Sequence, residues 1–127
     1  MGDSETAPIV VCLGSVVVDH SFWVGEIMLP PSKNVARQYH LGPGGMAANA
    51  AIAVARLGGR AVFWARVGDD LNAPPLVTAL EAEGIDISGL HRAPGGRTPV
   101  SAVLVAKDGD RPTLRLRGEG VGGGGPR

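Results

Sequence analysis

Hydrophobic positions along most of the chain come in two kinds of block that alternate. A run of β-branched residues with one Gly-Ser break occurs at residues 9–18, IVVCLGSVVV, and a second apolar run occurs at residues 61–68, AVFWARVG. Such runs are typical of strands that are covered by helices on both sides. A third short strand is expected after IDISGL, which ends at residue 90.

The blocks between these runs predict helices. Residues 46–57 are apolar except for Asn49 and Arg56, and glycine pairs precede and follow them. Pro74-Pro75 begin a second helix that runs to Glu83, with an apolar side and an acidic side. The order strand, helix, strand, helix, strand predicts an α/β fold with a parallel sheet and helices on both of its faces.

Two further pairs of segments predict antiparallel strands. The first pair lies at about 21–28 and 35–41, within residues 21–41, and is joined by the turn Pro-Pro-Ser-Lys. The second pair lies within residues 99–117, where Asp-Gly between two apolar runs is a strong hairpin signal. The chain is therefore expected to carry a small antiparallel β unit beside its parallel sheet.

The last ten residues, GEGVGGGGPR, contain six glycines and no hydrophobic pattern. Such composition is typical of a flexible segment, so we expect one domain at 1–117 and a disordered tail at 118–127.

Composition narrows the function classes. The chain has 127 residues and a formal net charge of zero, whereas a nucleic-acid-binding protein normally carries a basic excess. Its single cysteine, Cys12, can form neither an internal disulfide nor a zinc cluster. The N-terminus is acidic where a signal peptide needs basic residues, and no apolar run reaches the about 20 residues of a membrane-spanning helix. We expect a cytoplasmic protein without a membrane or nucleic-acid partner.

Asp19 is the clearest candidate for ligand binding. It follows the first apolar run, and ligands of open α/β sheets bind at the carboxyl ends of the strands. A carboxylate there can accept hydrogen bonds from adjacent hydroxyls of a sugar. The alternative is an ordinary turn aspartate.

The turn GPGGMA before the first helix is the second candidate. Gly44 and Gly45 leave backbone N–H groups open to a ligand oxygen, and Asn49 follows one helical turn later. Since an unpaired buried amide costs about 1–3 kcal/mol, Asn49 needs a partner, either a ligand or the local backbone. The turn also fits a loose dinucleotide fingerprint, but it does not follow the first apolar run directly. There is no Gly-Lys-Ser/Thr phosphate loop.

The remaining charged residues give weaker signals. Lys33 and Arg37, with Arg115 and Arg117, would line a lid over an anionic or polyhydroxy ligand if the two antiparallel units fold together; otherwise they are solvated surface charges. The three histidines share no metal-ligand spacing, and no pair of nucleophile and base is recognisable.

Taken in order, CLGSVVVD, GGMAANAAIAVARLGG, VGDD, LEAEGIDISGL and TPVSAVLVAKDGDR resemble the ribokinase-like, or PfkB, family of carbohydrate kinases. The resemblance implies a Rossmann-like sheet with a small β lid over a sugar site. It also implies phosphoryl transfer from ATP, with Mg²⁺, to a sugar hydroxyl. By position, Asp19, Gly44, Gly45 and Asn49 match the substrate-binding residues of the family.

Four positions bear on the choice of sugar. Ribokinase-type members often carry Asn where this chain has Val17 and Lys where it has Met46, which argues against ribose. The segment KNVARQYHLGPGG resembles the sulfofructose kinase branch, in which a lysine matching Lys33 helps to hold the sulfonate, although that branch does not favour Asn at position 49.

The Gly-x-Gly-Asp motif, which supplies the catalytic base in this family, does not occur in the sequence. The chain is therefore expected to be the N-terminal, sugar-binding part of such a kinase, inactive alone and binding neither ATP nor a metal. The alternatives are a non-catalytic module that binds sugar or forms a homodimer through its lid strands, and a dinucleotide-binding domain.

Overall fold

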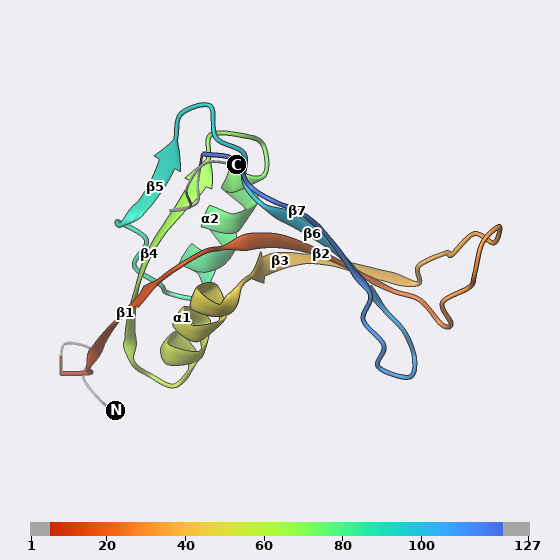
Figure 1. Ribbon diagram of the computed structural model, residues 1–127. Helices are drawn as coiled ribbons and strands as arrows, with labels where there is room; N and C mark the ends of the chain where they lie inside the picture. The colour runs from red at the N-terminus through yellow and green to blue at the C-terminus, as the bar shows by residue number, and fades with distance from the viewer. Residues whose placement is uncertain (1–5, 121–127) are drawn as a thin grey trace.

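The computed structural model describes residues 6–120, which form two β-sheets and two helices (Figure 1). The parallel sheet has the order β1-β4-β5 and consists of β1 (Ile9–Leu13), β4 (Arg60–Gly68) and β5 (Leu90–Ala93). The lid sheet has the order β3-β2-β6-β7 and consists of β2 (Val17–Trp23), β3 (Gln38–Gly44), β6 (Val100–Val105) and β7 (Thr113–Leu116). The helices are α1 (Met46–Arg56) and α2 (Ala73–Ala82).

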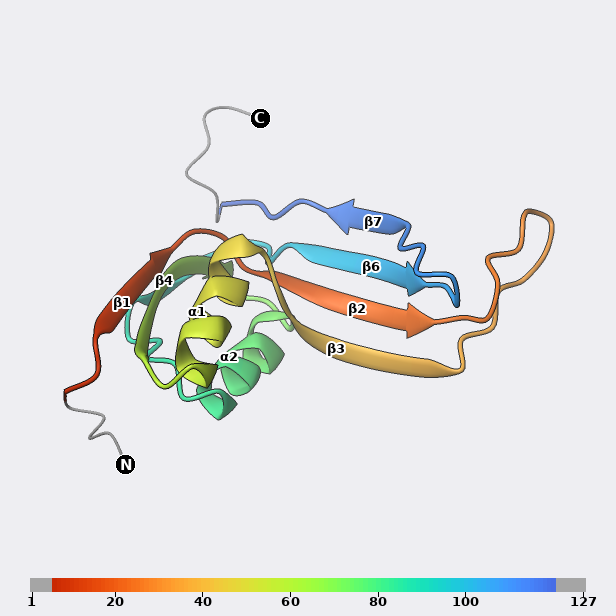
Figure 2. The ribbon, with the colours of Figure 1, turned by 90° about the horizontal axis from the view of Figure 1, so that it is seen from below.

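The lid sheet projects from the body of the molecule as a long arm (Figure 2). Its outer pairs, β2 with β3 and β6 with β7, are antiparallel, as expected. Its central pair, β2 with β6, is parallel, so the lid is a mixed sheet and not a purely antiparallel one.

The apolar run at residues 9–18, expected to be one strand, is divided between the two sheets. The amide of Gly14 still donates to the Trp64 carbonyl of β4, whereas the amide of Val18 donates to the Pro99 carbonyl beside β6. At Gly14 the backbone passes close to α1, since a Cβ there would lie 2.7 Å from the Cβ of Ala47. The Gly-Ser break is therefore where the chain leaves the parallel sheet and enters the lid.

The first two lid strands lie nearer the body than the pattern predicted. They were expected at about 21–28 and 35–41, and they occur at 17–23 and 38–44. Their register pairs Asp19 with Gly42 and Ser21 with His40. The intervening segment is a loop in which the Asn34 side chain bonds both backbone groups of Met28. Local side-chain bonding of this kind competes with strand pairing.

A hydrophobic core lies between the two helices and one face of the parallel sheet. Alternate residues of β4 point into it and meet small and aliphatic residues of both helices: Ala61, Phe63, Ala65, Val67, Ala48, Ala51, Leu76 and Leu80. Small side chains on α1 allow the helix to approach the sheet closely. This packing fixes the start of α1 beside the base of the lid.

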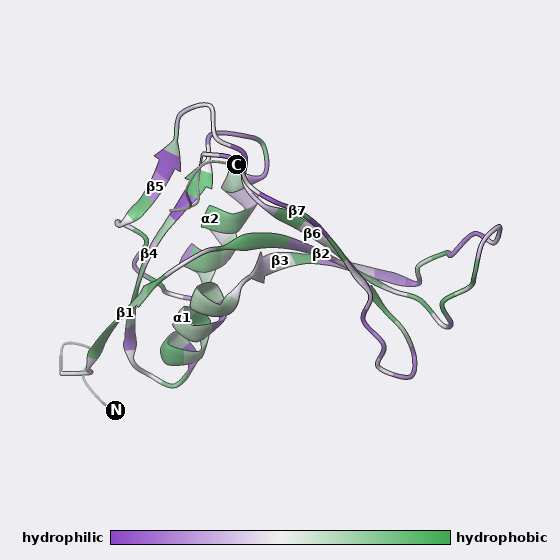
Figure 3. Cartoon of the chain, viewed as in Figure 1, coloured by the Kyte–Doolittle hydropathy of each residue, from purple (hydrophilic) through white to green (hydrophobic). Residues whose placement is uncertain are grey.

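The other face of the parallel sheet carries no helix within residues 6–120, so the expected cover on both faces is not met there. Ile9, Val11 and Leu13 of β1 are 58%, 47% and 76% exposed on this face, and Trp64, which pairs with Leu13, is 49% exposed. Figure 3 shows β1 as hydrophobic over its whole length. Parallel sheets are normally buried on both faces, and nothing in the part of the chain that the structure describes covers this apolar face.

The second residue of the predicted tail, Glu119, is paired with the body of the protein. Glu119 exchanges two backbone hydrogen bonds with Arg97, so the chain remains attached to the body at this point. The rest of the predicted tail, residues 121–127, lies outside the described residues. Neither described helix is long and apolar enough to cross a membrane.

Candidate functional site

Asp19 lies in the third position of β2, within the lid and not at the end of a strand of the parallel sheet. Its carboxylate accepts a hydrogen bond from the hydroxyl of Ser101, the residue opposite it on β6. The same carboxylate lies against Gly44 of β3, because a Cβ built on Gly44 would be only 2.0 Å from Asp19 Oδ2. Two neighbouring strands therefore fix the orientation of this half-buried carboxylate.

Gly44 and Gly45 are each required by the packing around them, which the sequence did not reveal. Gly44 is required because Asp19 occupies the space in which a side chain would lie. Gly45 has φ +99°, and a Cβ there would be 2.8 Å from the Ser15 carbonyl oxygen. The turn is thus formed by close approach of three protein segments, the β2 strand, the β3 end and the Ser15 bend.

Asn49 lies on the first turns of α1, with its backbone amide bonded to the carbonyl of Gly45. The expectation that its side chain is buried is wrong, because Asn49 is exposed. Its side-chain amide makes no hydrogen bond to any other residue in the range 6–120. The amide is therefore available to a ligand without the penalty that burial would impose.

A hollow of about 510 Å³ brings Asp19 and Asn49 together, between the lid and the outer sides of α1 and α2. The polar residues around it are Asp19, Ser21, His40, Asn49, Arg56 and Glu83. Gly44 lies directly under Asp19, and Gly45 caps α1 beside it. Four of the five residues predicted to bind substrate are thus within or next to one hollow.

Arg56 and Glu83 join the two helices at the far side of this hollow. The guanidinium of Arg56 donates from Nε to Glu83 Oε2 at 2.9 Å and from Nη2 to Oε1 at 2.5 Å. The hydrogen bonds and the charge of Arg56 lower the pKa of Glu83, and the same bonds raise the pKa of Arg56. The bidentate pair fixes the end of α1 against the end of α2.

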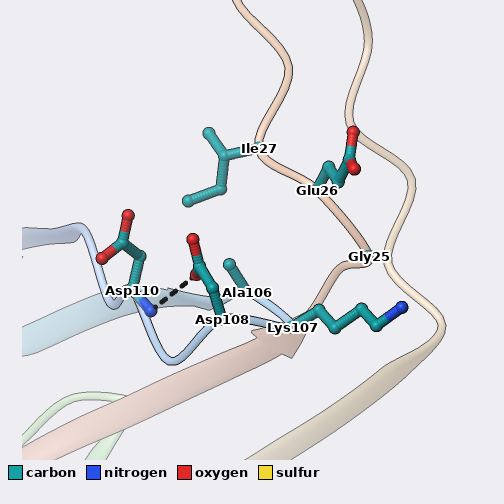
Figure 4. Close-up of a pocket in the computed structure, with 7 residues that line it drawn as sticks. All are labelled: Gly25, Glu26, Ile27, Ala106, Lys107, Asp108 and Asp110. Carbon is teal, nitrogen blue, oxygen red and sulfur yellow. Dashed lines mark hydrogen bonds between the residues drawn. The ribbon is translucent and has the colours of Figure 1, made fainter.

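Lys33, the fifth predicted residue, lies apart from the others. It is exposed in the loop between β2 and β3 and lines a separate hollow with Arg37 and Lys107 near the end of the lid. An adjoining hollow of about 550 Å³ lies between this loop and the β6–β7 turn, with Asp108 and Asp110 on the turn and Glu26 across from them (Figure 4). A contact of Lys33 with the substrate therefore stays a prediction.

Arg37, Arg115 and Arg117, the other cations proposed for a lid, are all exposed and do not line the hollow with Asp19. Asp69 and Asp70 follow β4 and have structural roles: Asp69 accepts a hydrogen bond from the amide of Gly95 at 2.9 Å. Asp70 accepts hydrogen bonds from the amide and the hydroxyl of Thr98, at 2.9 and 2.7 Å, and so ties the end of β4 to the start of β6.

Sequence reasoning missed Ser101, Ser21 and His40. Ser101 is 1% exposed. Its hydroxyl is the one polar side chain in the sequence VSAVLV of β6, and this isolated polar residue could have indicated a buried hydrogen bond. The positions of Ser21 and His40 follow only from the register between β2 and β3, which the sequence pattern misplaced.

The start of α1 does not suit a phosphate group. The N-terminus of α1, where an anion would be favoured, already lies beside the Asp19 carboxylate, which repels phosphate. No group of three histidine, cysteine or carboxylate side chains in residues 6–120 is placed to hold a metal. The glycine turn also follows a lid strand and not a strand of the parallel sheet, which argues against a dinucleotide site.

Comparison with known proteins shows the family of the chain. The model of the pfkB family of carbohydrate kinases matches residues 8–119. Probable fructokinase-7 from Arabidopsis thaliana is 36% identical over 115 residues, which are 91% of this chain and 32% of that protein.

Solved structures share the fold as well. A candidate ribokinase from Agrobacterium tumefaciens aligns with a TM-score of 0.85 and 34% identity, over 88% of this chain and 37% of its own. A ribokinase from Cryptococcus neoformans in complex with ADP aligns with a TM-score of 0.71 and 26% identity, over 90% of this chain and 36% of its own.

The chain spans about a third of the length of these relatives. The family match runs from residue 8, just before β1, to Glu119, which pairs with Arg97. It includes β2 with Asp19, the glycine turn and α1. The chain belongs to the pfkB family of carbohydrate kinases.

Proposed function

We propose that this chain is the acceptor-binding part of an ATP-dependent carbohydrate kinase, in which Asp19 and Asn49 hold hydroxyls of the acceptor sugar. The observation that carries the proposal is the single hollow that contains both side chains, next to the Gly44-Gly45 turn. The family membership supplies the reaction class.

Each group has a defined task in binding. The Asp19 carboxylate, held by Ser101, accepts hydrogen bonds from sugar hydroxyls and keeps a fixed direction while it does so. The Asn49 amide can both donate and accept, so it suits a hydroxyl that does the same. The lid strands then cover the acceptor from the side opposite α1.

Phosphoryl transfer needs further parts that position the γ-phosphate, the metal ion and the attacking hydroxyl. We assign ATP and Mg²⁺ binding to the remaining two thirds of the kinase domain, since the relatives are about three times as long as the aligned region. On this proposal the 127-residue chain binds sugar but transfers no phosphate, and the cytoplasm, where ATP and sugars meet, is its proposed compartment.

Sugar binding by the whole chain tests this proposal. Isothermal titration with D-fructose, D-ribose and a sulfonated fructose should give saturable heat with at least one of them. Asp19→Asn should weaken that binding by about tenfold or more, because a hydrogen bond to a charged group contributes about 1.5–3 kcal/mol. Lys33→Ala should matter only for the sulfonated sugar. Binding of NAD in place of any sugar would contradict the proposal.

The outer face of the lid supports a second role, a homodimer formed through the lid strands. Register places Phe22, Tyr39, Leu104 and Leu114 on the face opposite Asp19, and Leu114 is 77% exposed. An apolar patch of this kind is typical of an interface between identical subunits. Sedimentation should give a dimer for the chain and a monomer for Leu114→Glu, and a monomeric parent chain would exclude this role.

A further inference from the structure

The two histidines of the lid lie on opposite faces. His20 pairs with Leu41 across the β2–β3 ladder, and its Nδ1 lies 2.6 Å from the hydroxyl of Tyr39, with the two rings stacked. His40 pairs with Ser21 and so lies on the same face as Asp19. His20 is therefore engaged within the lid, whereas His40 belongs to the wall of the hollow.

The imidazole of His40 bends along its strand toward the base of the lid. Its Nε2 lies 3.0 Å from the position that a Cβ of Gly42 would take. Gly42 is the residue paired with Asp19, so the ring covers the stretch of β3 directly opposite the carboxylate. Only the absence of a side chain at Gly42 leaves room for the ring in this place.

His40 also has no internal partner among residues 6–120. It is exposed, and within the described range 6–120 its ring nitrogens make no hydrogen bond. A neutral imidazole offers one donor and one acceptor, and both are free to meet a ligand that enters the hollow. The Asp19 carboxylate and the His40 imidazole face the same hollow from neighbouring strands, and such a pair suits a ligand with several hydroxyls.

We propose that His40 binds the acceptor sugar from the lid side and selects for a hydroxyl that Asp19 and Asn49 do not reach. The inference rests on the proposed function, since it assigns a further contact in the same hollow. In this arrangement the acceptor lies between α1 and the lid, with Asn49 on one side and the imidazole on the other. A sugar that lacks the hydroxyl at this position leaves the imidazole unpaired and binds more weakly.

Binding of fructose and ribose, and of the deoxy analogues of each, to the full chain tests the assignment. His40→Ala should raise Kd by about 2- to 10-fold for the preferred sugar, the range expected when a neutral hydrogen bond is lost. It should change Kd little for the one deoxy analogue that lacks the hydroxyl in question. His40→Gln, which keeps a donor and an acceptor, should restore part of the affinity. His20→Gln is the matched control and should bind as the parent chain does.

Gly42→Ala gives a second test that leaves the imidazole in the chain. Gly42 does not have a positive φ, so alanine is compatible with the backbone, and its Cβ would displace only the ring of His40. Gly42→Ala should weaken sugar binding in the parent chain but add nothing in the His40→Ala background. In NMR spectra, the ring resonances of His40 should shift with added sugar while those of His20 do not.

The possible failures are distinguishable. If Asp19→Asn abolishes binding while His40→Ala and Gly42→Ala bind like the parent chain, His40 is not a contact and the proposed function stands. If the parent chain binds no sugar at millimolar concentration, both proposals are overturned.

Discussion

At the scale of single residues, the contact between Asp19 and Gly44 is the most restrictive feature of the site. Gly44→Ala would place a methyl group in the space of the Asp19 carboxylate, so the carboxylate must leave Ser101 or the strands must separate. Forced packing of this kind costs about 1–3 kcal/mol. We expect a loss of that size in the free energy of unfolding, measured by urea denaturation, together with loss of sugar binding.

The double variant identifies the cause of this loss. In the Asp19→Ala background the carboxylate is gone, so Gly44→Ala should cost much less stability than it does in the parent chain. Such a cycle measures the coupling between the two positions. Equal costs in both backgrounds would mean that Gly44 is needed for its backbone and not for the space above it.

At the scale of secondary-structure elements, the sequence pattern predicted both helices well and the lid poorly. The helix bounds followed from glycine pairs and from Pro74-Pro75, which are local signals. The division of residues 9–18 did not follow, because both halves of the run are apolar and only pairing with β4 or β6 separates them. Register between β2 and β3, which places His40 opposite Ser21, depends on contacts between segments that the pattern does not relate.

The same limit applies to the candidate site. Asp19, Gly44, Gly45 and Asn49 were predicted from their positions beside a strand and a glycine turn, and the structure places them together. For two of these residues the structural role differs from the one predicted. Asn49 is exposed and not buried, and Gly44 leaves space for the Asp19 carboxylate. These reasons depend on packing between segments far apart in the chain, which local patterns do not contain.

The ion pair between α1 and α2 should give a pH-dependent contribution to stability. Because Arg56 lowers the pKa of Glu83, the pair stabilises the fold above the ordinary pKa of a glutamate, and this contribution is lost as the pH falls through the lowered pKa of Glu83. Arg56→Gln should therefore lower the unfolding temperature at pH 7, and the difference from the parent chain should shrink as the pH falls through the lowered pKa of Glu83.

Arg66→Gln is the matched control for this comparison. Arg66 is exposed on β4 and forms no ion pair within residues 6–120, so its variant should follow the parent chain at every pH. A difference for Arg56→Gln that persists at low pH would assign the effect to packing of the Arg56 side chain.

At the scale of the whole molecule, the bare face of the parallel sheet is the clearest sign of how the chain functions. We expect this face, which carries Val11, Leu13 and Trp64, to be covered by the remaining two thirds of a pfkB kinase domain. Trp64 is a direct reporter, since the chain has two tryptophans and Trp23→Phe leaves Trp64 alone. Adding the C-terminal two thirds of the Agrobacterium relative should shift Trp64 emission to shorter wavelength and raise the unfolding temperature.

A charge on the bare face provides the control for this last prediction. Val11→Lys lies on the exposed side of β1, away from the core and from the lid, so it should leave sugar binding unchanged. It should also prevent the emission shift, because a lysine there would be buried without a partner in the joined domain. If Val11→Lys shifts like the parent chain, the added polypeptide associates elsewhere. The bare face would then not be the surface through which this chain becomes part of a kinase.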